Sequence, residues 1–509
     1  MSGPKGAAVA PPLVGEYDTL AEAMDAAAKQ FGDRDAFVEG AVSLSFSEWQ
    51  RKADGLARVL VGRGVGPGDR VALVLPSSID YAIGYGAIVR AGAIATGLSM
   101  RLGPREFEAI LAKADPSLII AESVAGAPTI PAHYAVLDRS ELSAAYDNPG
   151  LGGDRPRREA TDPVVIIWTS GTTGVPKGAW FDHRNLAAAV KSAGVMSGPF
   201  DRRLVATPFQ HAGYMAKIWD QLAWGSTIVI SPTPWTAPAM LDLLMQQKIN
   251  VAGGVPTQWA KLLELPGIEQ MDFSHVRLGL VATAPAAPEL IERVTAVLGC
   301  PLIVRYAMTE SPSITGTEPG DSPEVLYRTV GRTQVGMAVE IVDAVGALVA
   351  NGEVGRVRVS GACVMRGYWD DPELTRQVLD DGGRLTSSDL GRFDADGNLV
   401  LVGRANDMYI RGGYNVYPLE VENVLAEHPG VVTAAIVGVP APIIGEIGVA
   451  FVVPTDPSTP PSLEDLRAWV RDRLADYKAP DRLEIVEGLP LTALLKVDKL
   501  SLLNRATTS

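Results

Sequence analysis

The stretch Thr169-Ser170-Gly171-Thr172-Thr173-Gly174-Val175-Pro176-Lys177-Gly178 decides how the rest of the chain is interpreted. It follows the apolar run Val164 to Trp168, which predicts a buried strand. Its glycines let the backbone turn tightly near a ligand, its hydroxyls supply donors, and Lys177 adds a positive charge. Successive backbone N–H groups in such a turn form an anion-binding concavity. The stretch therefore predicts a loop that holds nucleotide phosphates, with Thr169 to Gly174 and Lys177 as the contacting residues.

Two other interpretations of this loop can be compared with it. A Walker A motif requires Gly, four residues, and then Gly-Lys-Ser/Thr. Here Gly171 is followed by Gly174, and Lys177 by Gly178, so that motif is excluded. An ordinary Gly/Thr-rich connection is the second alternative. The preceding strand and the density of phosphate-suited groups argue against it.

The ten residues resemble the phosphate loop of the adenylate-forming superfamily, which comprises acyl-CoA synthetases, adenylation domains and luciferases. They fit that superfamily's Thr-Ser-Gly-Thr-Thr-Gly-x-Pro-Lys-Gly pattern. The resemblance extends from about residue 20 to residue 500, with five motifs in the family's order. It implies the α/β fold, the cofactors ATP, Mg²⁺ and coenzyme A, and the residue roles given below.

Composition limits the class of protein independently of this resemblance. A chain of 509 residues is too long for one core, so at least two domains are expected. A net charge of −14 argues against general nucleic-acid binding. The two cysteines, Cys300 and Cys363, fit a reducing cytoplasm. We expect a cytoplasmic protein without a signal peptide or transmembrane segment, because the longest apolar stretch, Tyr81 to Leu98, is broken by Arg90 and glycines. The sequence is compatible with a homodimer but does not establish the oligomeric state.

The order of apolar and polar segments predicts a large N-terminal α/β domain. Strands alternate with helices up to Val304, which is typical of parallel-rich sheets with flanking helices. The predicted helices are Thr19 to Gln30 and Ser47 to Gly62, and the predicted strands are Arg70 to Leu75, Leu204 to Ala206, Thr227 to Ile230, Asn250 to Ala252, Leu278 to Ala282 and Pro301 to Val304. We interpret the polar segment Glu141 to Ala160 as a surface linker.

The pattern changes near Val339, where short strands joined by Gly- and Asn-containing turns predict a small β subdomain. The segment Arg404 to Gly413 is polar and glycine-rich, and we interpret it as a linker. The remaining residues mix helices (Pro418 to Glu427, Ser462 to Asp476) with strands (Val431 to Val437, Val449 to Val453). We therefore predict an N-terminal domain of residues 1–404 and a small mobile α+β domain of residues 405–509, with a hinge near residue 406.

The motif Arg305-Tyr306-Ala307-Met308-Thr309-Glu310 follows a predicted strand, and ligands of open α/β sheets bind at such carboxyl ends. Tyr306 can cover an adenine face, Thr309 offers a hydroxyl, and Glu310 is a hard oxygen ligand for Mg²⁺. The motif resembles the family's Tyr-Gly-x-Thr-Glu, with Ala307 in place of glycine. That replacement adds a methyl group to the acid pocket.

Two further motifs concern the nucleotide and coenzyme A. Thr386-Ser387-Ser388-Asp389 resembles the family's Thr-Gly-Asp motif, which makes Asp389 the acceptor for ribose hydroxyls. The string from Gly403 to Glu420 resembles the family's linker motif. By that resemblance Arg404 contacts ribose or phosphate, Asn406 is the hinge, and the loop Gly412-Gly413 approaches the thiol of coenzyme A.

The end of the chain carries the expected catalytic lysine. Leu489 to Lys496 resembles the family's Pro-x-Thr-x-x-Gly-Lys motif, with Leu495 in place of the glycine. Lys496 would bridge the substrate carboxylate and the α-phosphate. Lys499, one helical turn away, is the competing candidate for this role.

The acid pocket is the least defined part of the predicted site. His211 resembles a residue at the pocket mouth of the family, and Ala284-Pro285 lies where the family's backbone runs along the adenine. The expected pocket segments are His211 to Met215, Val255-Pro256, Val281-Ala282 and Tyr306 to Met308. They are apolar and offer nothing that binds a second charge. We therefore predict a hydrophobic acid, whether fatty, aromatic or polycyclic.

Together these motifs predict an AMP-forming acid–CoA ligase. The carboxylate attacks the α-phosphorus of ATP, pyrophosphate leaves, and the thiol of coenzyme A then displaces AMP. Positioned cations and hydroxyl donors would perform most of the catalysis. Three alternatives stay open at this stage: an enzyme that loads a carrier protein, a luciferase-like oxidase and a non-catalytic nucleotide-binding protein.

Overall fold

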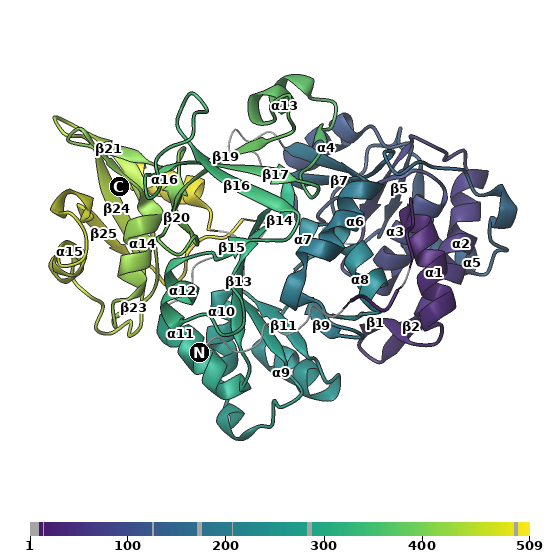
Figure 1. Ribbon diagram of the computed structural model, residues 1–509, viewed down its shortest axis with the longest axis horizontal. Helices are drawn as coiled ribbons and strands as arrows, with labels where there is room; N and C mark the ends of the chain where they lie inside the picture. Colours follow the sequence, from purple (N-terminus) through teal and green to yellow (C-terminus); the bar gives the residue numbers. More distant parts are fainter. Residues whose placement is uncertain are drawn as a thin grey trace.

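The structure is a computed structural model that describes residues 10–13, 15–124, 127–169, 176–205, 207–281, 288–492 and 497–508. Its described strands form four sheets, of nine, seven, five and four strands. Figure 1 shows the seven-stranded sheet with its helices at the right, strands β9, β11 and β13 of the nine-stranded sheet in the middle, and the C-terminal residues at the left. The predicted α/β class with a large N-terminal part and a small C-terminal part is confirmed.

The seven-stranded sheet contains the strand before the phosphate loop. In spatial order it consists of β18 (Gly367–Tyr368), β8 (Lys177–Asp182), β7 (Pro163–Thr169), β4 (Ile94–Gly97), β3 (Arg70–Val74), β5 (Leu118–Ala121) and β6 (Val136–Asp138). The strands from β7 to β6 are parallel, whereas β8 and β18 pair antiparallel. The buried central strands read as apolar runs, as expected for a sheet covered on both faces.

The nine-stranded sheet contains the Tyr306 motif. Its order is β15 (Arg332–Thr333), β14 (Ser311–Gly316), β13 (Leu302–Met308), β12 (Leu278–Val281), β11 (Val251–Gly254), β9 (Arg202–Val205), β10 (Thr227–Ile230), β1 (Asp35–Glu39) and β2 (Val42–Ser45). The strands from β13 to β1 are parallel, and antiparallel strands close both ends.

Helices cover these sheets, and their starts follow local sequence signals. Thr19 and Ser45 begin α1 and α2 with capping boxes, in which each hydroxyl accepts from the backbone three residues on. The large-domain helices are α1 (Leu20–Phe31), α2 (Phe46–Gly62), α3 (Ile79–Arg90), α4 (Pro104–Ala114), α5 (Leu142–Tyr146), α6 (His183–Ser192), α7 (Ala212–Met215), α8 (Ile218–Trp224), α9 (Ala237–Gln246), α10 (Pro256–Leu263), α11 (Pro288–Leu298), α12 (Pro323–Arg328) and α13 (Pro372–Val378). Ten of the twelve residues of α3 are buried, so the apolar stretch Tyr81 to Leu98 is a core helix followed by β4.

The last two sheets are mainly antiparallel. The four-stranded sheet has the order β16 (Met337–Val342), β17 (Gly355–Gly361), β19 (Leu385–Phe393) and β20 (Leu399–Arg404), which confirms the predicted β subdomain. The five-stranded sheet consists of β22 (Tyr414–Val416), β21 (Tyr409–Arg411), β24 (Gly445–Pro454) and β23 (Val431–Ala441), with β25 (Arg482–Ile485) parallel to β24. Helices α14 (Pro418–Ala426), α15 (Leu463–Arg471) and α16 (Lys499–Thr508) complete this part.

The structure corrects two segments that we interpreted as linkers. Within Glu141 to Ala160 lies α5, which buries Leu142 and Ala145 and lets the Tyr146 hydroxyl donate to Asp80 at 2.7 Å. Within Arg404 to Gly413 lies β21, whose Arg411 forms a two-pronged ion pair with Asp481, at 2.9 and 2.6 Å. In both cases a partner distant in sequence orders a polar segment.

Candidate active site

The predicted phosphate loop lies between two antiparallel strands. Strand β7 ends at Thr169 and β8 begins at Lys177, and these two residues are direct partners in the sheet. Lys177 therefore starts the returning strand instead of lying in the loop. The predicted contacts Ser170, Gly171, Thr172, Thr173 and Gly174 lie outside the described residues. Thr169 and Lys177 mark the two ends of the connection.

A segment that the sequence analysis did not single out joins Lys177 to Glu310. Strand β18 pairs with β8, and the Trp369 N–H donates to the Gly178 carbonyl at 2.7 Å. The Tyr368 hydroxyl donates to Glu310 Oε1 at 2.8 Å, and Lys177 Nζ lies 5.7 Å from the centre of the Tyr368 ring. Tyr368 therefore brings a cation and a carboxylate, 133 residues apart, to the same place.

Glu310 is held by its backbone as well as by its side chain. Strand β13 extends to Met308, further than the sequence predicted, and Thr309 and Glu310 form the turn into β14. The Met365 N–H donates to the Glu310 carbonyl at 2.8 Å. Burial, followed by the charge of Glu310, raises the pKa of the Tyr368 hydroxyl far above its ordinary value. That hydroxyl therefore stays protonated and donates to the carboxylate at neutral pH.

Asp389 accepts hydrogen bonds from the two neighbours that the motifs predicted for the nucleotide. The Tyr306 hydroxyl donates to Asp389 Oδ2 at 2.5 Å, and Arg404 Nε donates to Oδ1 at 3.0 Å. Asp389 lies within strand β19 and faces Arg404 of β20 directly. Burial, followed by the Asp389 charge, raises the pKa of Tyr306 well above its ordinary value. Each oxygen of Asp389 keeps a lone pair for a ribose hydroxyl.

The motif residues around Tyr306 differ in exposure. Tyr306 is buried, with 8% of its surface exposed, so its ring packs in the protein core. Ala307 is exposed, and Met308, Thr309 and Glu310 are half-buried. In this arrangement the Tyr306 hydroxyl donates to Asp389, and little of the residue is exposed to cover an adenine face.

His211 occupies the start of α7, next to an aromatic cluster. It is half-buried and precedes the first helical residue, Ala212. Phe209 and Tyr214 on either side of it stack with their ring centres 3.8 Å apart. His211, predicted at the mouth of the acid pocket, therefore lies beside aromatic rings, whereas Ala284 and Pro285, predicted beside the adenine, lie outside the described residues.

The C-terminal candidates lie in separate places. Gly412 and Gly413 form the turn between β21 and β22 with φ of 58° and 87°, a left-handed conformation that favours glycine twice in succession. In Figure 1 strand β21 lies at the outer left edge, away from β13 and β14 in the middle. Lys496 lies outside the described residues. Its competitor Lys499 pairs with Glu422 at 2.8 Å and with Asp407 at 3.8 Å.

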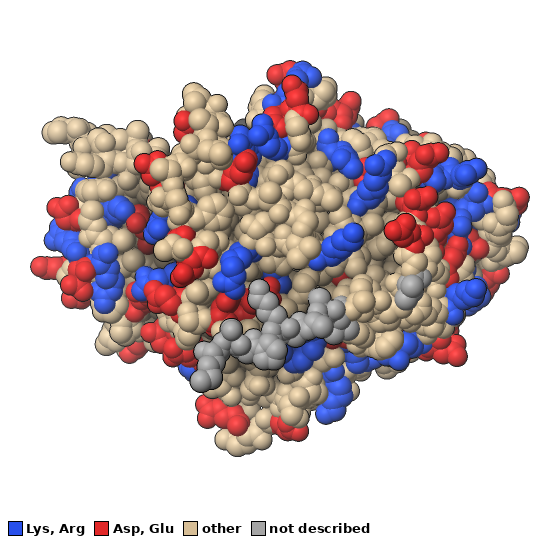
Figure 2. Space-filling view, viewed as in Figure 1, with Lys and Arg blue, Asp and Glu red and all other residues tan. Residues whose placement is uncertain are grey.

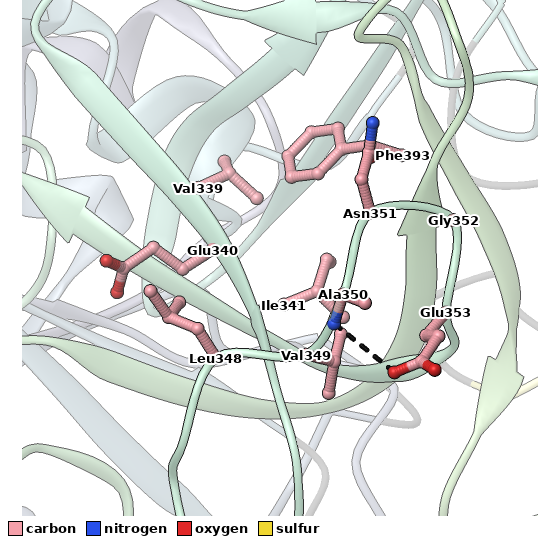
Figure 3. Close-up of a pocket in the computed structure, with 10 residues that line it drawn as sticks. All are labelled: Val339, Glu340, Ile341, Leu348, Val349, Ala350, Asn351, Gly352, Glu353 and Phe393. Carbon is pink, nitrogen blue, oxygen red and sulfur yellow. Dashed lines mark hydrogen bonds between the residues drawn. The ribbon is translucent and has the colours of Figure 1, made fainter.

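A cavity elsewhere contains none of the predicted residues. It measures about 260 Å³ and is lined by ten residues of β16, β19 and the connection between β16 and β17, including Val339 and Phe393. Figure 3 shows that Glu353 at its rim accepts from the Ala350 N–H, at 3.2 Å, so this polar group is already paired locally. On the face drawn in Figure 2, acidic and basic side chains are interspersed, without a continuous basic area.

The described residues provide a donor set that fits MgATP. Lys177 offers a cation at the end of the predicted phosphate loop, and Glu310 offers a hard oxygen of the kind that Mg²⁺ prefers. Asp389 offers acceptors that a ribose could use, and Arg404 beside it is a permanent cation. Burial alone would lower the pKa of Arg404, but the charges of Asp389 and Asp407 raise it above its ordinary value. These groups come from three sheets and meet beside strand β13.

Comparison with known proteins gives the same assignment. A family model described as AMP-binding enzyme matches residues 24–369, and one described as AMP-binding enzyme C-terminal domain matches residues 420–496. The chain belongs to this family of adenylate-forming enzymes. It is an ATP-dependent, AMP-forming acid–CoA ligase, and ATP, Mg²⁺ and coenzyme A are the cofactors of this class. The predicted family, reaction class and cofactors are confirmed.

Individual relatives cover nearly the whole chain. A feruloyl-CoA synthase from an Amycolatopsis species is 35% identical over 476 residues, which is 91% of this chain and 94% of the relative. A methyl-dioxo-octahydro-indenyl-propanoyl:CoA ligase from Mycobacterium tuberculosis is 32% identical, over 96% of this chain and 99% of the relative. The crystal structure of ATP-bound MatB from Rhodopseudomonas palustris superimposes with a TM-score of 0.86 at 28% identity, over 95% of this chain and 98% of that one.

Proposed function

We propose that this ligase activates a hydrophobic carboxylic acid, whether fatty, aromatic or polycyclic, and transfers the acyl group to coenzyme A. The observation that carries the proposal is the meeting of Lys177, Glu310 and Asp389 beside β13, through Tyr368 and Tyr306. The names of the relatives support the substrate class, because they include an aromatic acid and a polycyclic acid. The apolar segment around Phe209 and Tyr214 supports it as well.

The residues predicted to bind ATP and Mg²⁺, together with Lys496, would act in the first half-reaction. MgATP, when bound, supplies the electrophilic α-phosphorus. Thr169 to Gly174 and Lys177 would hold the phosphates, Glu310 would hold Mg²⁺, and Asp389 with Arg404 would hold the ribose. Lys496 would neutralise the charge that grows on the phosphate and the carboxylate. The acid is already ionised at pH 7, so no general base is required.

We assign the second half-reaction to a different placement of the C-terminal residues. The Gly412-Gly413 loop lies at the edge of the molecule in Figure 1, although the resemblance places it near the reacting thiol. A rotation of residues 405–509 about Asn406 would bring this loop to the acyl-adenylate. The short connection supports such a hinge, because Arg404 ends β20 and β21 begins only at Tyr409.

We also propose that the enzyme works in the cytoplasm. Cys300 and Cys363 are both free and buried, which suits a reducing compartment. Within the described residues, none of the helices combines the length and apolarity that crossing a membrane requires.

The test is a panel of fatty, aromatic and polycyclic acids incubated with ATP and Mg²⁺. One set of reactions contains coenzyme A, a second contains a pantetheinylated carrier protein, and a third contains neither. Mass spectrometry then measures AMP and the acyl thioester. We expect AMP and acyl-CoA in the first set only. Thioester on the carrier protein but not on coenzyme A would contradict the proposed acceptor, and absence of AMP with every acid would contradict the proposed reaction.

A further inference from the structure

The turn expected to face the thiol of coenzyme A is built from two consecutive glycines. Gly412 and Gly413 connect β21 to β22 with φ of 58° and 87°. Glycine has the largest conformational freedom of all residues, so a turn of this composition does not fix its own geometry. The position of the turn must therefore come from the residues that flank it and from the contacts that those residues make.

The hairpin of β21 and β22 is anchored differently at its two ends. At its base, Tyr409 and Val416 are direct partners, with 1% and 0% of their surfaces exposed, and both belong to the core of the C-terminal part. Next to the turn, Arg411 and Tyr414 are direct partners, and Tyr414 is 58% exposed. Apolar burial therefore holds the base, whereas the end that carries the glycines depends on specific side-chain contacts.

The first of these contacts joins Arg411 to a carboxylate from a distant segment. Its Nε and Nη2 donate to Asp481 Oδ2 and Oδ1 at 2.9 and 2.6 Å, and 18% and 15% of the two side chains are exposed. Such a two-pronged pair fixes the direction of the guanidinium as well as its distance. The hydrogen bond to Asp481 is also the main cause that raises the pKa of Arg411 above its ordinary value. The pair therefore ties the last residue before Gly412 to the segment around Asp481.

Asp481 is itself fixed by its surroundings. Its backbone N–H donates to the Gly448 carbonyl at 2.8 Å, and its Oδ2 accepts from the Gly448 N–H at 3.2 Å. Arg467 of α15 is a second cation near it, 3.8 Å from Oδ1, and donates to the neighbouring Pro480 carbonyl at 3.1 Å. The carboxylate is therefore a fixed point of the five-stranded sheet, against which Arg411 is positioned.

The second contact holds the other flank of the turn and comes from the same segment. Tyr414 stacks on Tyr477, with ring centres 4.5 Å apart and an angle of 19° between the ring planes. Tyr477 lies in the short helical turn Asp476–Lys478, four residues before Asp481. Strands β21, β24 and β25 of this sheet lie together at the left of Figure 1. Residues 477–481 therefore contact both residues that flank the glycines.

We propose that Asp481 is a positioning residue for the second half-reaction. Through Arg411 it holds the Gly412-Gly413 turn in the geometry that guides the thiol of coenzyme A to the acyl-adenylate. Tyr477 supports the same turn from its other side, through Tyr414. This inference rests on the proposed acid–CoA ligase function and on the role proposed there for the turn.

Two assays separate the half-reactions in the full-length enzyme. Pyrophosphate exchange into ATP with an accepted acid measures the first, and acyl-CoA formation from supplied acyl-adenylate and coenzyme A measures the second. Asp481→Asn keeps the shape of the side chain but removes its charge, and Arg411→Met keeps an unbranched apolar stem. We expect each variant to lower kcat/KM for coenzyme A about 10- to 100-fold, because misplacing a positioned group by about 1 Å can cost about 100-fold. Exchange should stay at the wild-type rate, and the buried base of the hairpin should keep both variants folded.

Further variants test whether the contacts act as described. If Asp481 acts through Arg411, the double variant should lose no more than the more damaged single variant, because changes to two partners of one contact are not additive. Tyr477→Phe retains the ring stack and should form acyl-CoA at the wild-type rate. Tyr477→Leu should lower acyl-CoA formation about two- to tenfold, which is the rate equivalent of one aromatic pair.

Lys478→Met is the matched control for the loss of an ion pair. Lys478 Nζ donates to Glu420 of α14 at 2.6 Å, and 16% and 28% of the two side chains are exposed. This pair has similar burial and lies in the same part of the chain, but it joins two residues outside the hairpin. The ratio of the two half-reaction rates should therefore stay at the wild-type value.

The possible results separate this inference from the proposed function. Wild-type acyl-CoA formation by Asp481→Asn and Arg411→Met overturns the inference and leaves the proposed function standing. Equal losses in both half-reactions, or a loss in Lys478→Met as large as in Asp481→Asn, overturn it as well, because they indicate general loosening of the C-terminal part. A loss in Arg411→Met without one in Asp481→Asn overturns the role of Asp481 and makes Arg411 a direct contact of coenzyme A. Absence of AMP from the wild type with every acid overturns the proposed function and the inference with it.

Discussion

Removing one oxygen atom from Tyr368 should weaken the first half-reaction. Tyr368→Phe keeps the ring that Lys177 faces at 5.7 Å but deletes the hydroxyl that donates to Glu310 at 2.8 Å. A hydrogen bond to a charged group contributes about 1.5–3 kcal/mol, which corresponds to about 10- to 100-fold in rate if it acts fully on the productive MgATP complex. We expect a loss in this range for adenylation, together with a requirement for higher Mg²⁺.

The assay is pyrophosphate exchange into ATP, measured over a range of Mg²⁺ concentrations. Glu310→Gln provides the upper limit of the effect, because it removes the carboxylate charge itself. Tyr327→Phe is the matched control, since the Tyr327 hydroxyl also donates to a glutamate, Glu292, at 3.0 Å but lies outside the predicted site. It should leave exchange unchanged.

The reasoning would be refuted by a Tyr368→Phe protein that exchanges pyrophosphate at the wild-type rate with the wild-type Mg²⁺ dependence. A decrease in thermal stability with unchanged exchange would show that Tyr368 only holds β18 against the Glu310 turn. In that case the hydroxyl positions the fold and not the metal ligand.

Three further predictions concern Lys496, the hinge and pH. Lys496→Ala should reduce adenylation about 10²–10³-fold, while thioester formation from supplied acyl-adenylate survives. Lys499→Ala is the control, because Lys499 is paired with Glu422. A larger loss of adenylation in Lys499→Ala than in Lys496→Ala would move the catalytic role to Lys499. Asn406→Pro should retain pyrophosphate exchange but lose most acyl-CoA formation, because proline fixes φ near −65° and so opposes the rotation that the second half-reaction requires. Wild-type rates in both assays would place the hinge elsewhere. Burial, followed by the charge of Arg158, lowers the pKa of His183 to about 4, and its Nδ1 accepts from the Leu20 N–H at 3.1 Å. The unfolded chain binds this proton more tightly, so the free energy of unfolding should fall by about 3 kcal/mol as the pH drops from 6.5 to 4. Chemical denaturation at several pH values checks this, and His183→Gln should lose less stability over the same interval than the wild type.

The sequence by itself determined the local structure and the identity of the motifs. Apolar runs such as Val164 to Trp168 predicted buried strands, and the patterns of Thr19 to Gln30 and Ser47 to Gly62 predicted helices, because these signals depend on neighbours within a few residues. The order of the phosphate loop, the Tyr306 motif and Asp389 was sufficient to recognise the family. Each of these features can be identified without knowing which segments pack together.

Only the tertiary structure decided which side chains meet. Tyr368 bonds Glu310 across 58 residues, and Tyr306 bonds Asp389 across 83 residues. The polar segment containing Arg411 became a strand because Asp481, 70 residues away, pairs with it. Hydrogen bonds and ion pairs of this kind depend on approach in space within about 3 Å, and no pattern of neighbouring residues encodes that approach.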